Sequence, residues 1–368
     1  MTGIPEDFGF MARALRLAKR GLYTADPNPR VGCIIVRNDE IVGEGWHQRA
    51  GGHHAEIMAL ENAGEAGVGA TAYVSLEPCC HHGRTPPCTD ALIAAGIERV
   101  VIASTDPNPA VAGQGASQLV AAGVQVQSGV LADESRALNV GFFRRMQTNR
   151  PYLRAKIAIS LDGRTALANG ESKWITGVAA RADVQRWRAG SSAILTGIGT
   201  VLADDPLLTV RDKDLGPVEQ PLRIIVDSQL RTPVDAKMFG SPGSVRIFCV
   251  EALSKTRSAL AAAGAAVEVL EAADGRVPLA AVLSRLAELE VNEVLVEAGP
   301  TLNGALLEAG LLDELVVYMA SNILGADGRG MFKIPELTSM SNRTELKMLD
   351  MRRVGDDCRL TFRKLLDH

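Results

Sequence analysis

The chain has 368 residues, of which 46% are hydrophobic and 22% charged, and its net charge is -4. The length favours two domains, and the composition allows a full globular core to be buried. The acidic balance argues against a nucleic-acid partner, which would require a basic patch, and favours a small-molecule substrate.

We expect that the N-terminal segment 1–10 is not a signal peptide. It carries Glu6 and Asp7 and lacks a long apolar run, unlike a signal peptide. No continuous apolar run in the sequence is long enough to span a membrane. We therefore expect a cytoplasmic protein that does not associate with a membrane.

The first 150 residues predict alternating helices and strands. Apolar residues at helical spacing alternate with short apolar runs that turn residues separate. The predicted helices span 8–19, 54–63, 88–95 and 115–122, and the predicted strands span 31–36, 41–46, 72–76, 100–103 and 124–126. This alternation predicts an α/β sheet with helices on both faces.

A second α/β run follows a predicted domain boundary. The polar and basic stretch 144–151 ends in Pro151 and separates a domain of residues 1–149 from a domain of residues 150–368. The second domain has predicted strands at 153–159, 193–196, 222–226, 245–250, 267–270, 293–296 and 315–319, and predicted helices that include 181–188 and 279–289. We expect the alanine-rich stretch 259–266 to be a helix and 344–351 to pair antiparallel with 358–364. The predicted fold class is α/β, with two three-layer domains.

Histidine and cysteine gather in one short part of the chain. Five of the six histidines lie between His47 and His82, and three of the six cysteines lie between Cys79 and Cys88. The pattern H-x-E followed by P-C and a later Cys is typical of a zinc-dependent deaminase. It assigns the metal to His54, Cys79 and Cys88, and proton transfer to Glu56.

These residue types suit a hydrolytic deamination. A catalytic zinc ion takes three protein ligands and leaves a fourth position for water, whose pKa the metal lowers to about 7. Glu56 would take the proton of that water and deliver it to the substrate ring and the leaving amine. Such proton transfer typically contributes about 10²–10⁴ in rate.

Neighbouring residues leave alternatives open for the metal site. His53 and Cys80 adjoin the chosen ligands but do not fit the pattern, and His81 and His82 belong to a loop that is expected to face the substrate. A structural zinc site would use four protein ligands, with Cys80 or His82 as the fourth. Glu56, in register with His54, disfavours that alternative.

Asn28 lies in the proline-flanked stretch 27–30, just before the first predicted strand. Asn and Pro both favour turns, so a turn residue is one interpretation. The other is a side-chain amide that contacts the pyrimidine or ribose of a substrate, and on that interpretation Asn28 is a candidate substrate contact.

Longer motifs cover 27–33, 43–47, 54–56 and 76–88 in the first half and 160–165, 170–176, 201–206 and 296–302 in the second half. Together they resemble one family, the bifunctional deaminase/reductases of riboflavin biosynthesis. The long spacing between Cys79 and Cys88 is this family's form of the deaminase motif. Cys80 departs from the family, in which serine is expected.

The resemblance implies two consecutive reactions. A cytidine-deaminase-like N-terminal domain would deaminate 2,5-diamino-6-(5-phosphoribosylamino)pyrimidin-4-one, using one zinc ion. A dihydrofolate-reductase-like C-terminal domain would then use NADPH to reduce the ribosyl chain to ribityl. The resemblance also implies a homo-oligomer.

The resemblance further implies contacts in the second domain. Cofactor contacts are expected at Ala158, Trp174, Thr200, Asp204, Ser228, Gly299, Pro300, Thr301, Leu302, Asn303, Gly304 and Ala305. Substrate contacts are expected at Ser172, Arg188, Leu208, Arg211 and Glu297. The glycine-rich turn after the strand 293–296 opens a helix whose backbone N–H groups suit a phosphate, and an arginine fork suits a ribose phosphate. Asp204 and Lys156 are the candidate proton donors for the reduction.

Two other functions compete with this hypothesis. A deaminase of tRNA or free nucleosides would share the zinc motif but would leave residues 151–368 without a role. A zinc-stabilised binding protein would need no residue in the position of Glu56.

Overall fold

The computed structural model describes residues 5–81 and 86–364. The chain divides into two compact units, an N-terminal unit of Met1–Arg150 and a C-terminal unit of Pro151–His368. No helix in the described part of the chain is long and apolar enough to cross a membrane.

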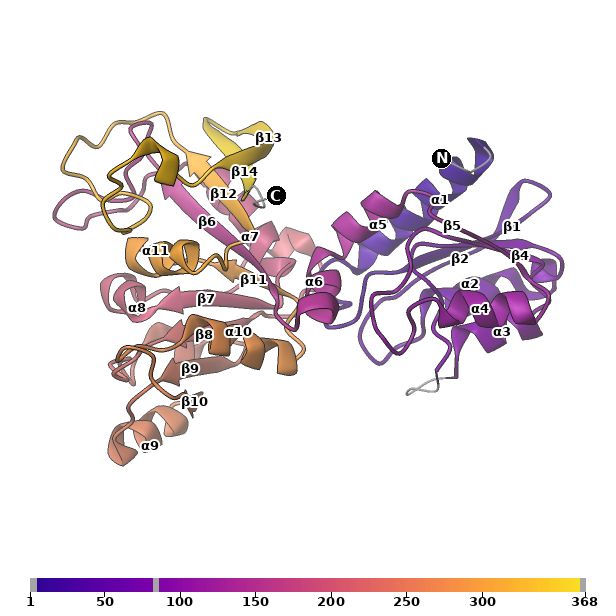
Figure 1. Cartoon of the computed structure of the whole chain (residues 1–368), viewed down its shortest axis with the longest axis horizontal. Coiled ribbons are helices and arrows are strands. Elements are labelled where there is room, and N and C mark those ends of the chain that lie inside the picture. Colours follow the sequence, from indigo (N-terminus) through magenta and orange to yellow (C-terminus); the bar gives the residue numbers. More distant parts are fainter. Residues whose placement is uncertain (1–4, 82–85, 365–368) are drawn as a thin grey trace. The chain divides into compact units, whose positions relative to one another are not determined.

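The N-terminal unit has one sheet. Its described residues form five strands in the order β2-β1-β3-β4-β5 (Figure 1). β1 runs antiparallel to β2 and β3, and β3, β4 and β5 are parallel. The strands are β1 (Gly32–Arg37), β2 (Glu40–Trp46), β3 (Thr71–Val74), β4 (Arg99–Ile102) and β5 (Gln125–Ser128). The helices are α1 (Pro5–Ala18), η1 (Lys19–Gly21), α2 (Ala55–Ala63), η2 (Gly64–Gly67), α3 (Cys88–Ala94), α4 (Gln114–Ala121), α5 (Ala132–Leu138) and α6 (Val140–Thr148).

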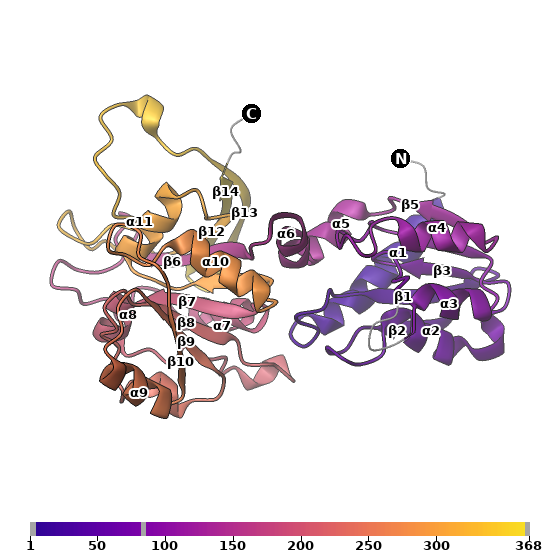
Figure 2. The same cartoon turned by 60° about the horizontal axis from the view of Figure 1, so that its bottom comes forward.

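Both faces of this sheet are covered, because successive side chains of a strand point to opposite sides. Ile35 and Val74 pack in one apolar cluster with residues of α2, α3 and α4. Ile34 and Tyr73 pack in a second cluster with residues of α1 and α5. Figures 1 and 2 show these helices on the two sides of the sheet. The N-terminal unit therefore has the three predicted layers.

The C-terminal unit contains a larger sheet. Nine strands of its described residues lie in the order β10-β9-β8-β7-β11-β6-β12-β14-β13, and all pairs from β10 to β12 are parallel. The strands are β6 (Tyr152–Ile159), β7 (Ala193–Gly197), β8 (Leu222–Val226), β9 (Val245–Cys249), β10 (Ala265–Val269), β11 (Glu293–Val296), β12 (Glu314–Met319), β13 (Leu346–Val354) and β14 (Asp357–Lys364). The helices are α7 (Val178–Ala189), α8 (Ile198–Asp204), η3 (Lys213–Leu215), η4 (Lys237–Gly240), α9 (Ser254–Ala262), α10 (Leu279–Glu288), α11 (Pro300–Glu308) and η5 (Met340–Asn342).

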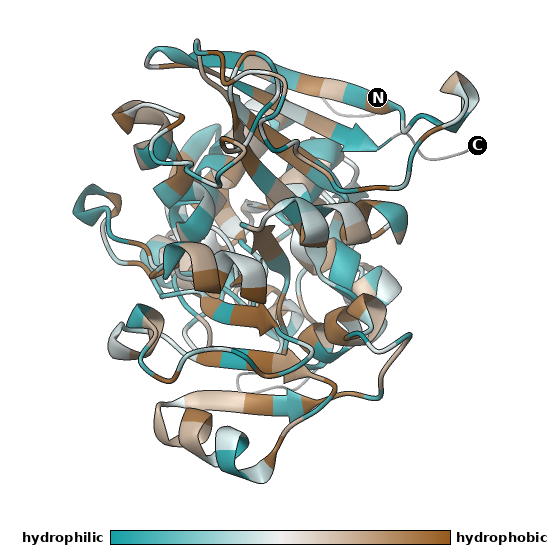
Figure 3. Ribbon diagram, turned by 90° about the vertical axis from the view of Figure 1, so that its left-hand side faces the viewer, coloured by the Kyte–Doolittle hydropathy of each residue, from teal (hydrophilic) through white to brown (hydrophobic). Residues whose placement is uncertain are grey.

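Helices again cover both faces of the sheet. Leu153 and Leu195 belong to an apolar cluster that includes residues of α10 and α11. Ile194 and Ile225 face the other way and pack in a cluster with residues of α8 and α9, and α7 packs against β12. Figure 3 shows that hydrophobic residues concentrate on the strands between these helices. The prediction of two three-layer α/β units is confirmed.

Two local features of the structure differ from the predictions. The predicted helix 259–266 is wrong at its end: α9 stops at Ala262, Gly264 takes a left-handed φ of +99°, and Ala265 begins β10. α5 and α6 were not predicted, and α6 covers most of the stretch 144–151 that marks the predicted boundary. The predicted antiparallel pair near the C-terminus is confirmed as β13 and β14.

Glycines in β2 bring α2 into direct contact with the sheet. A Cβ atom on Gly43 would lie 2.2 Å from the Ala59 carbonyl oxygen, and one on Gly45 would lie 2.2 Å from the Ala55 carbonyl oxygen. Only glycine allows two backbones to approach so closely. These contacts fix the start of α2, which follows His54 directly.

We predict that Gly45→Ala destabilises the N-terminal unit by about 1–3 kcal/mol, because the added methyl group must displace α2. Gly9→Ala is the matched control, since a Cβ atom there meets nothing within 4 Å and alanine favours a helix. Urea unfolding of the full chain measures both variants. Equal unfolding midpoints for the two variants would contradict the prediction.

Candidate functional site

The three predicted metal ligands of the N-terminal unit lie together. The ligand atoms of His54, Cys79 and Cys88 are all within 4.8 Å of one another. The His54 Nδ1 atom lies 3.2 Å from the Cys88 sulfur and 3.5 Å from the Cys79 sulfur. One imidazole and two thiols that converge in this way fit a zinc ion with an open fourth position.

Different elements hold the three ligands in place. His54 is the N-cap residue of α2, and Cys88 is the first residue of α3. Cys79 lies in the loop after β3, and its carbonyl oxygen accepts hydrogen bonds from the Thr89 backbone N–H at 3.2 Å and the Thr89 hydroxyl at 3.3 Å. The loop of Cys79 is therefore bonded to the start of α3.

The Glu77 side chain also holds this loop in place through hydrogen bonds. Its side chain is buried and accepts hydrogen bonds from the backbone N–H groups of Asp106, Gly113 and Ala116, at 3.0–3.1 Å. A carboxylate at the start of α4 is also favoured by the helix dipole. In the sequence Glu77 is one residue of the motif 76–88, and its role in placing Cys79 depends on backbone N–H groups that lie 29, 36 and 39 residues away.

The site favours a thiolate at Cys79. The hydrogen bond from Cys88 is the largest cause that lowers the pKa of the Cys79 thiol, although burial opposes it, and a hydrogen bond from His54 adds to the effect. Metal ligands of this type must be deprotonated. The same hydrogen bond raises the pKa of Cys88, because the proton is shared between the two thiols.

Glu56 is buried in the first turn of α2, two residues after His54. Burial raises the pKa of its carboxyl group to about 7. A carboxyl group with such a pKa can both accept and release a proton at neutral pH. The position and the chemistry therefore suit the predicted proton carrier.

Asn28 contacts a histidine that the metal motif does not include. The Asn28 amide donates to the His47 Nε2 atom at 3.0 Å, and the His47 Nδ1 atom lies 3.1 Å from the His53 carbonyl oxygen. Because that oxygen can only accept, Nδ1 carries the proton and Nε2 accepts from Asn28. Burial lowers the pKa of His47, so the ring is neutral, and it lies edge-on to His54 with 5.6 Å between ring centroids.

The described neighbours His53, Cys80 and His81 do not belong to the ligand cluster. His53 is exposed and lies 3.3 Å from Glu61. The Cys80 sulfur points to the Ala110 carbonyl oxygen at 3.9 Å, and His81 is exposed. His82 lies outside the described residues. Among those described, the metal-binding group contains three ligands and no fourth.

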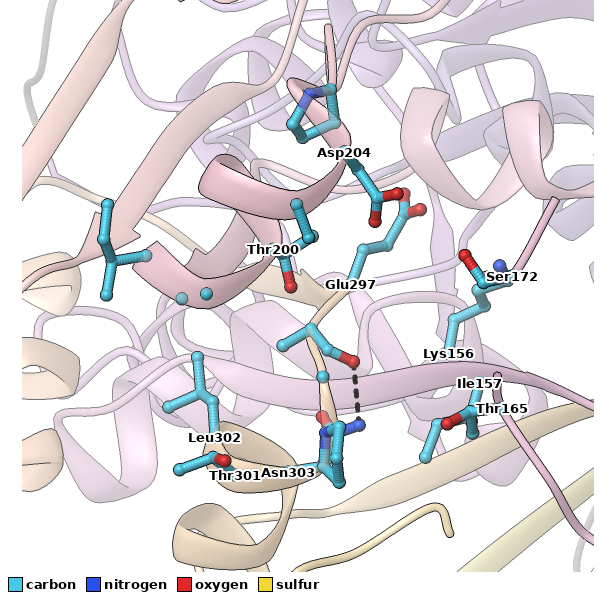
Figure 4. Close-up of a pocket in the computed structure, with 18 of the residues that line it drawn as sticks. Lys156, Ile157, Thr165, Ser172, Thr200, Asp204, Glu297, Thr301, Leu302 and Asn303 are labelled. Carbon is cyan, nitrogen blue, oxygen red and sulfur yellow. Dashed lines mark hydrogen bonds between the residues drawn. The ribbon is translucent and has the colours of Figure 1, made fainter. Parts of the chain in front are cut away.

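The C-terminal unit contains a cavity of about 1100 Å³. It lies at the carboxyl ends of β6, β7, β8 and β11, where parallel α/β sheets commonly bind ligands. Every residue predicted to contact the cofactor or the substrate in this unit lines it, apart from Gly304. Figure 4 shows Lys156, Thr200, Glu297 and Asn303 on its walls.

A buried ion pair lies on the substrate side of the cavity. The Arg188 guanidinium binds both carboxylate oxygens of Glu297, at 2.6 and 2.9 Å, and donates to the Thr209 carbonyl oxygen at 2.9 Å. Burial opposes ionisation of Glu297, but Arg188 outweighs it and keeps the pKa of that carboxyl below its usual range. Arg188 thus has a protein partner on each side, and Lys156, whose pKa burial lowers, lies beside the pair.

Arg211 differs from Arg188 in its partners. Its guanidinium donates to the Thr209 hydroxyl at 3.2 Å and forms no ion pair in the described part of the chain. Leu208, three residues earlier, is buried with a left-handed φ of +50°. This turn directs the segment after α8 along the cavity, so Arg211 presents an unpaired positive charge there.

The start of α11 forms another wall. Gly299 is its N-cap residue, and no side chain caps the helix, so the N–H groups of its first turn are available to an anion. The Asn303 amide nitrogen donates to the Ala298 carbonyl oxygen at 3.1 Å (Figure 4), while its buried Oδ1 atom has no partner. A bound group with a hydrogen-bond donor would satisfy that oxygen, so the cavity fits a nicotinamide dinucleotide.

Gly304 has a packing role instead. A Cβ atom there would lie 2.1 Å from the Lys333 carbonyl oxygen, so glycine lets α11 contact the segment around Lys333. The remaining predicted residues line other parts of the cavity. Trp174 is 70% exposed with the Arg181 guanidinium 4.5 Å from its ring centroid, and Asp204 lies 3.6 Å from the Lys173 ammonium.

Two family models match this chain, one in each unit. Residues 5–104 match the family model of the cytidine and deoxycytidylate deaminase zinc-binding region, and residues 151–360 match that of the RibD C-terminal domain. The riboflavin biosynthesis protein RibD of Escherichia coli is 49% identical over 96% of this chain and 98% of its own length. The protein of that name from Haemophilus influenzae is 43% identical over 97% of each chain.

Solved structures give the same result over both units. One crystal form of RibD from Acinetobacter baumannii has a TM-score of 0.90 and 45% identity, over 98% of this chain and 99% of its own. A deaminase/reductase from Thermotoga maritima has a TM-score of 0.86 and 33% identity over the same shares. The predicted cytidine-deaminase-like and reductase folds are confirmed, and the chain belongs to the RibD family of riboflavin biosynthesis proteins.

Proposed function

We propose that this chain catalyses two consecutive steps of riboflavin biosynthesis. The first is hydrolytic deamination of 2,5-diamino-6-(5-phosphoribosylamino)pyrimidin-4-one to 5-amino-6-(5-phosphoribosylamino)uracil, and the second is reduction of the ribosyl chain to ribityl. The observation that carries the proposal is the cluster of His54, Cys79 and Cys88 with Glu56 buried beside it. The names of the relatives support both activities, since the Thermotoga maritima structure is described as a deaminase and a uracil reductase.

The deamination belongs to residues 1–149. His54, Cys79 and Cys88 would hold a zinc ion, which would lower the pKa of a bound water molecule toward neutral pH. Glu56 takes the proton of that water on its carboxylate and returns it first to the ring nitrogen and then to the leaving amine. Asn28, held by His47, presents its amide oxygen as a contact for the substrate.

The reduction belongs to residues 150–368 and uses NADPH, which supplies the hydride. The first-turn amides of α11 bind the cofactor phosphates, and Arg211 binds the substrate phosphate. Glu297, held by Arg188, accepts hydrogen bonds from sugar hydroxyls. We assign the accompanying proton to the Lys156 ammonium, because burial lowers its pKa while Asp204 faces Lys173.

We further propose that the protein works in the cytoplasm as a homo-oligomer. β13 is the edge strand of the larger sheet and exposes Leu346, Met348, Leu349 and Met351. An exposed apolar edge strand is a ready site for pairing with another strand, and a second copy of the chain would cover it.

The first prediction concerns the proton carrier. Glu56→Gln should retain one zinc per chain and lose about 10²–10⁴ in deamination rate, because the amide cannot shuttle the proton. Metal analysis and a deaminase assay measure the two effects. The reduction of the deaminated intermediate by the same variant is the control and should be unchanged. A wild-type deamination rate in this variant would refute the mechanism.

Another prediction concerns Arg211, the arginine proposed to bind the substrate phosphate. Arg211→Ala should raise the reductase KM for the phosphorylated intermediate about tenfold or more, because a charge-assisted hydrogen bond is lost. Lys213→Ala, an exposed residue outside the cavity lining, is the matched control. Deamination should be unaffected in both variants. Equal KM values in the two variants would remove Arg211 from the phosphate site.

The third prediction concerns the edge strand. Met351→Glu places a charge on an apolar residue that is 64% exposed in the single chain, so it should split the oligomer and leave the fold intact. Light scattering after size-exclusion chromatography gives the mass, and circular dichroism checks the fold. An unchanged oligomeric mass in a folded variant would place the interface elsewhere.

A further inference from the structure

The carboxyl end of β8 forms one end of the C-terminal cavity. Ser228 follows this strand, and its carbonyl oxygen accepts from the Val250 and Glu251 N–H groups, which follow β9. The Ser228 hydroxyl accepts from the Val277 N–H at 3.2 Å. The segment before α10 is therefore bonded to the end of β8, and both segments line the cavity.

Two arginines of these segments, Arg231 and Arg276, lie in turns whose backbone is held by hydrogen bonds. Arg276 ends a tight turn in which Ala273 and Arg276 exchange backbone hydrogen bonds of 3.0 and 2.9 Å. Both central residues of that turn have positive φ, Asp274 at +50° and Gly275 at +69°, as in the twisted two-residue turns of hairpins.

Arg231 lies in a second fixed turn. It stands between two buried residues, Leu230 and Thr232. The buried Asp227 carboxylate accepts from both the N–H and the hydroxyl of Thr232, each at 2.8 Å. The backbone on both sides of Arg231 is therefore held.

Neither guanidinium has a protein partner. In residues 5–81 and 86–364, no ion pair or side-chain hydrogen bond involves the side chain of Arg231 or Arg276. The carboxylates among the described cavity-lining residues are Asp204 and Glu297, on α8 and after β11. The described residues that line the cavity at the end of β8 thus include these two positive charges and no carboxylate.

The other lining arginines are in different places. Arg188 is bound by Glu297, Arg211 donates to Thr209, and Arg181 lies over Trp174. These three follow β6 and β7 in the chain and lie on or near α7. Arg329 follows β12, and its backbone pairs with Ala166, which follows β6. Because the strand order is β8-β7-β11-β6, Arg231 lies at the opposite end of the cavity from Lys156 on β6, with the start of α11 between them.

The order of Lys156, the start of α11 and Arg231 along the cavity matches the order of nicotinamide, pyrophosphate and adenosine ribose in a dinucleotide. With nicotinamide beside Lys156 and the pyrophosphate at α11, the adenosine ribose reaches the end of β8. A site that reads a ribose 2′-hydroxyl commonly offers a carboxylate, whereas a 2′-phosphate is bound by arginine. A guanidinium fork also matches phosphate oxygens in shape and charge.

We infer that Arg231 and Arg276 hold the 2′-phosphate of NADPH and make the enzyme select NADPH over NADH. The inference rests on the proposed reductase function, and it names the residues that decide which cofactor the site takes. It requires no contact with the substrate or with the N-terminal unit.

Binding experiments on the full chain test this inference without measuring activity. Calorimetric titrations with NADPH, NADH and adenosine 2′,5′-bisphosphate are run on the wild type, on Arg231→Ala, on Arg276→Ala and on the double variant. Each single variant should bind NADPH and the bisphosphate about tenfold more weakly, and the double variant about a hundredfold more weakly, because each loses a charge-assisted contact. Affinity for NADH should change by less than about twofold.

Arg257→Ala is the matched control, since Arg257 is exposed on α9 and does not line the cavity. It should bind all three ligands as the wild type does. Unchanged NADPH affinity in the double variant, or an equal loss for NADPH and NADH, would overturn the inference and leave the proposed reductase standing. Failure of the wild type to bind either cofactor would instead overturn the proposed cofactor site, and the inference with it.

Discussion

Both candidate sites depend on backbone segments that approach each other more closely than a side chain would allow. Gly43 and Gly45 remove the Cβ atoms that would otherwise displace α2 from β2, and Gly304 does the same where α11 meets the segment at Lys333. Each of these helices begins at functional residues, so its depth against the neighbouring backbone sets where those residues lie. Close packing transmits a displacement of one backbone to the next. These three glycines thus set where the proposed metal ligand His54 and the start of α11, the proposed phosphate site, lie.

Two glutamates, Glu56 and Glu297, show how the surroundings of a carboxyl group set its pKa. Burial is the largest influence on the pKa of the Glu56 carboxyl group and raises it to about 7. The Glu297 side chain is 13% exposed, and the Arg188 guanidinium holds its pKa below the usual range although burial opposes this. The first can therefore exchange a proton at neutral pH, and the second remains an anion that can orient hydroxyl groups. This difference supports separate acid–base and positioning roles for the two carboxylates, and it leaves the proton of the reduction to another residue.

Features that depend on residues close together in the sequence could be predicted from it. His54 and Glu56 are two residues apart, and the Pro78-Cys79 pair ends a strand, so the motif alone predicts the ligand cluster that the structure contains. It could not predict that Glu297 occupies the guanidinium of Arg188, because the two residues are 109 positions apart. The bond between Asn28 and His47 depends likewise on the packing of two loops. The end of α9 at Ala262 was missed because alanine favours a helix, while Gly264 and the following parallel strand override that preference.

The partner of each arginine is a more informative guide to function than its place in a motif. Arg188 and Arg211 both belong to predicted substrate contacts, yet one is neutralised by a carboxylate and the other is not. An arginine whose fork is filled by a buried carboxylate would have to give up that partner before it could bind a phosphate, at a cost of several kcal/mol. An arginine without a carboxylate partner at the wall of a cavity pays no such cost. Anionic groups of a ligand should therefore lie against the unpaired arginines, and the paired ones should shape the wall between them.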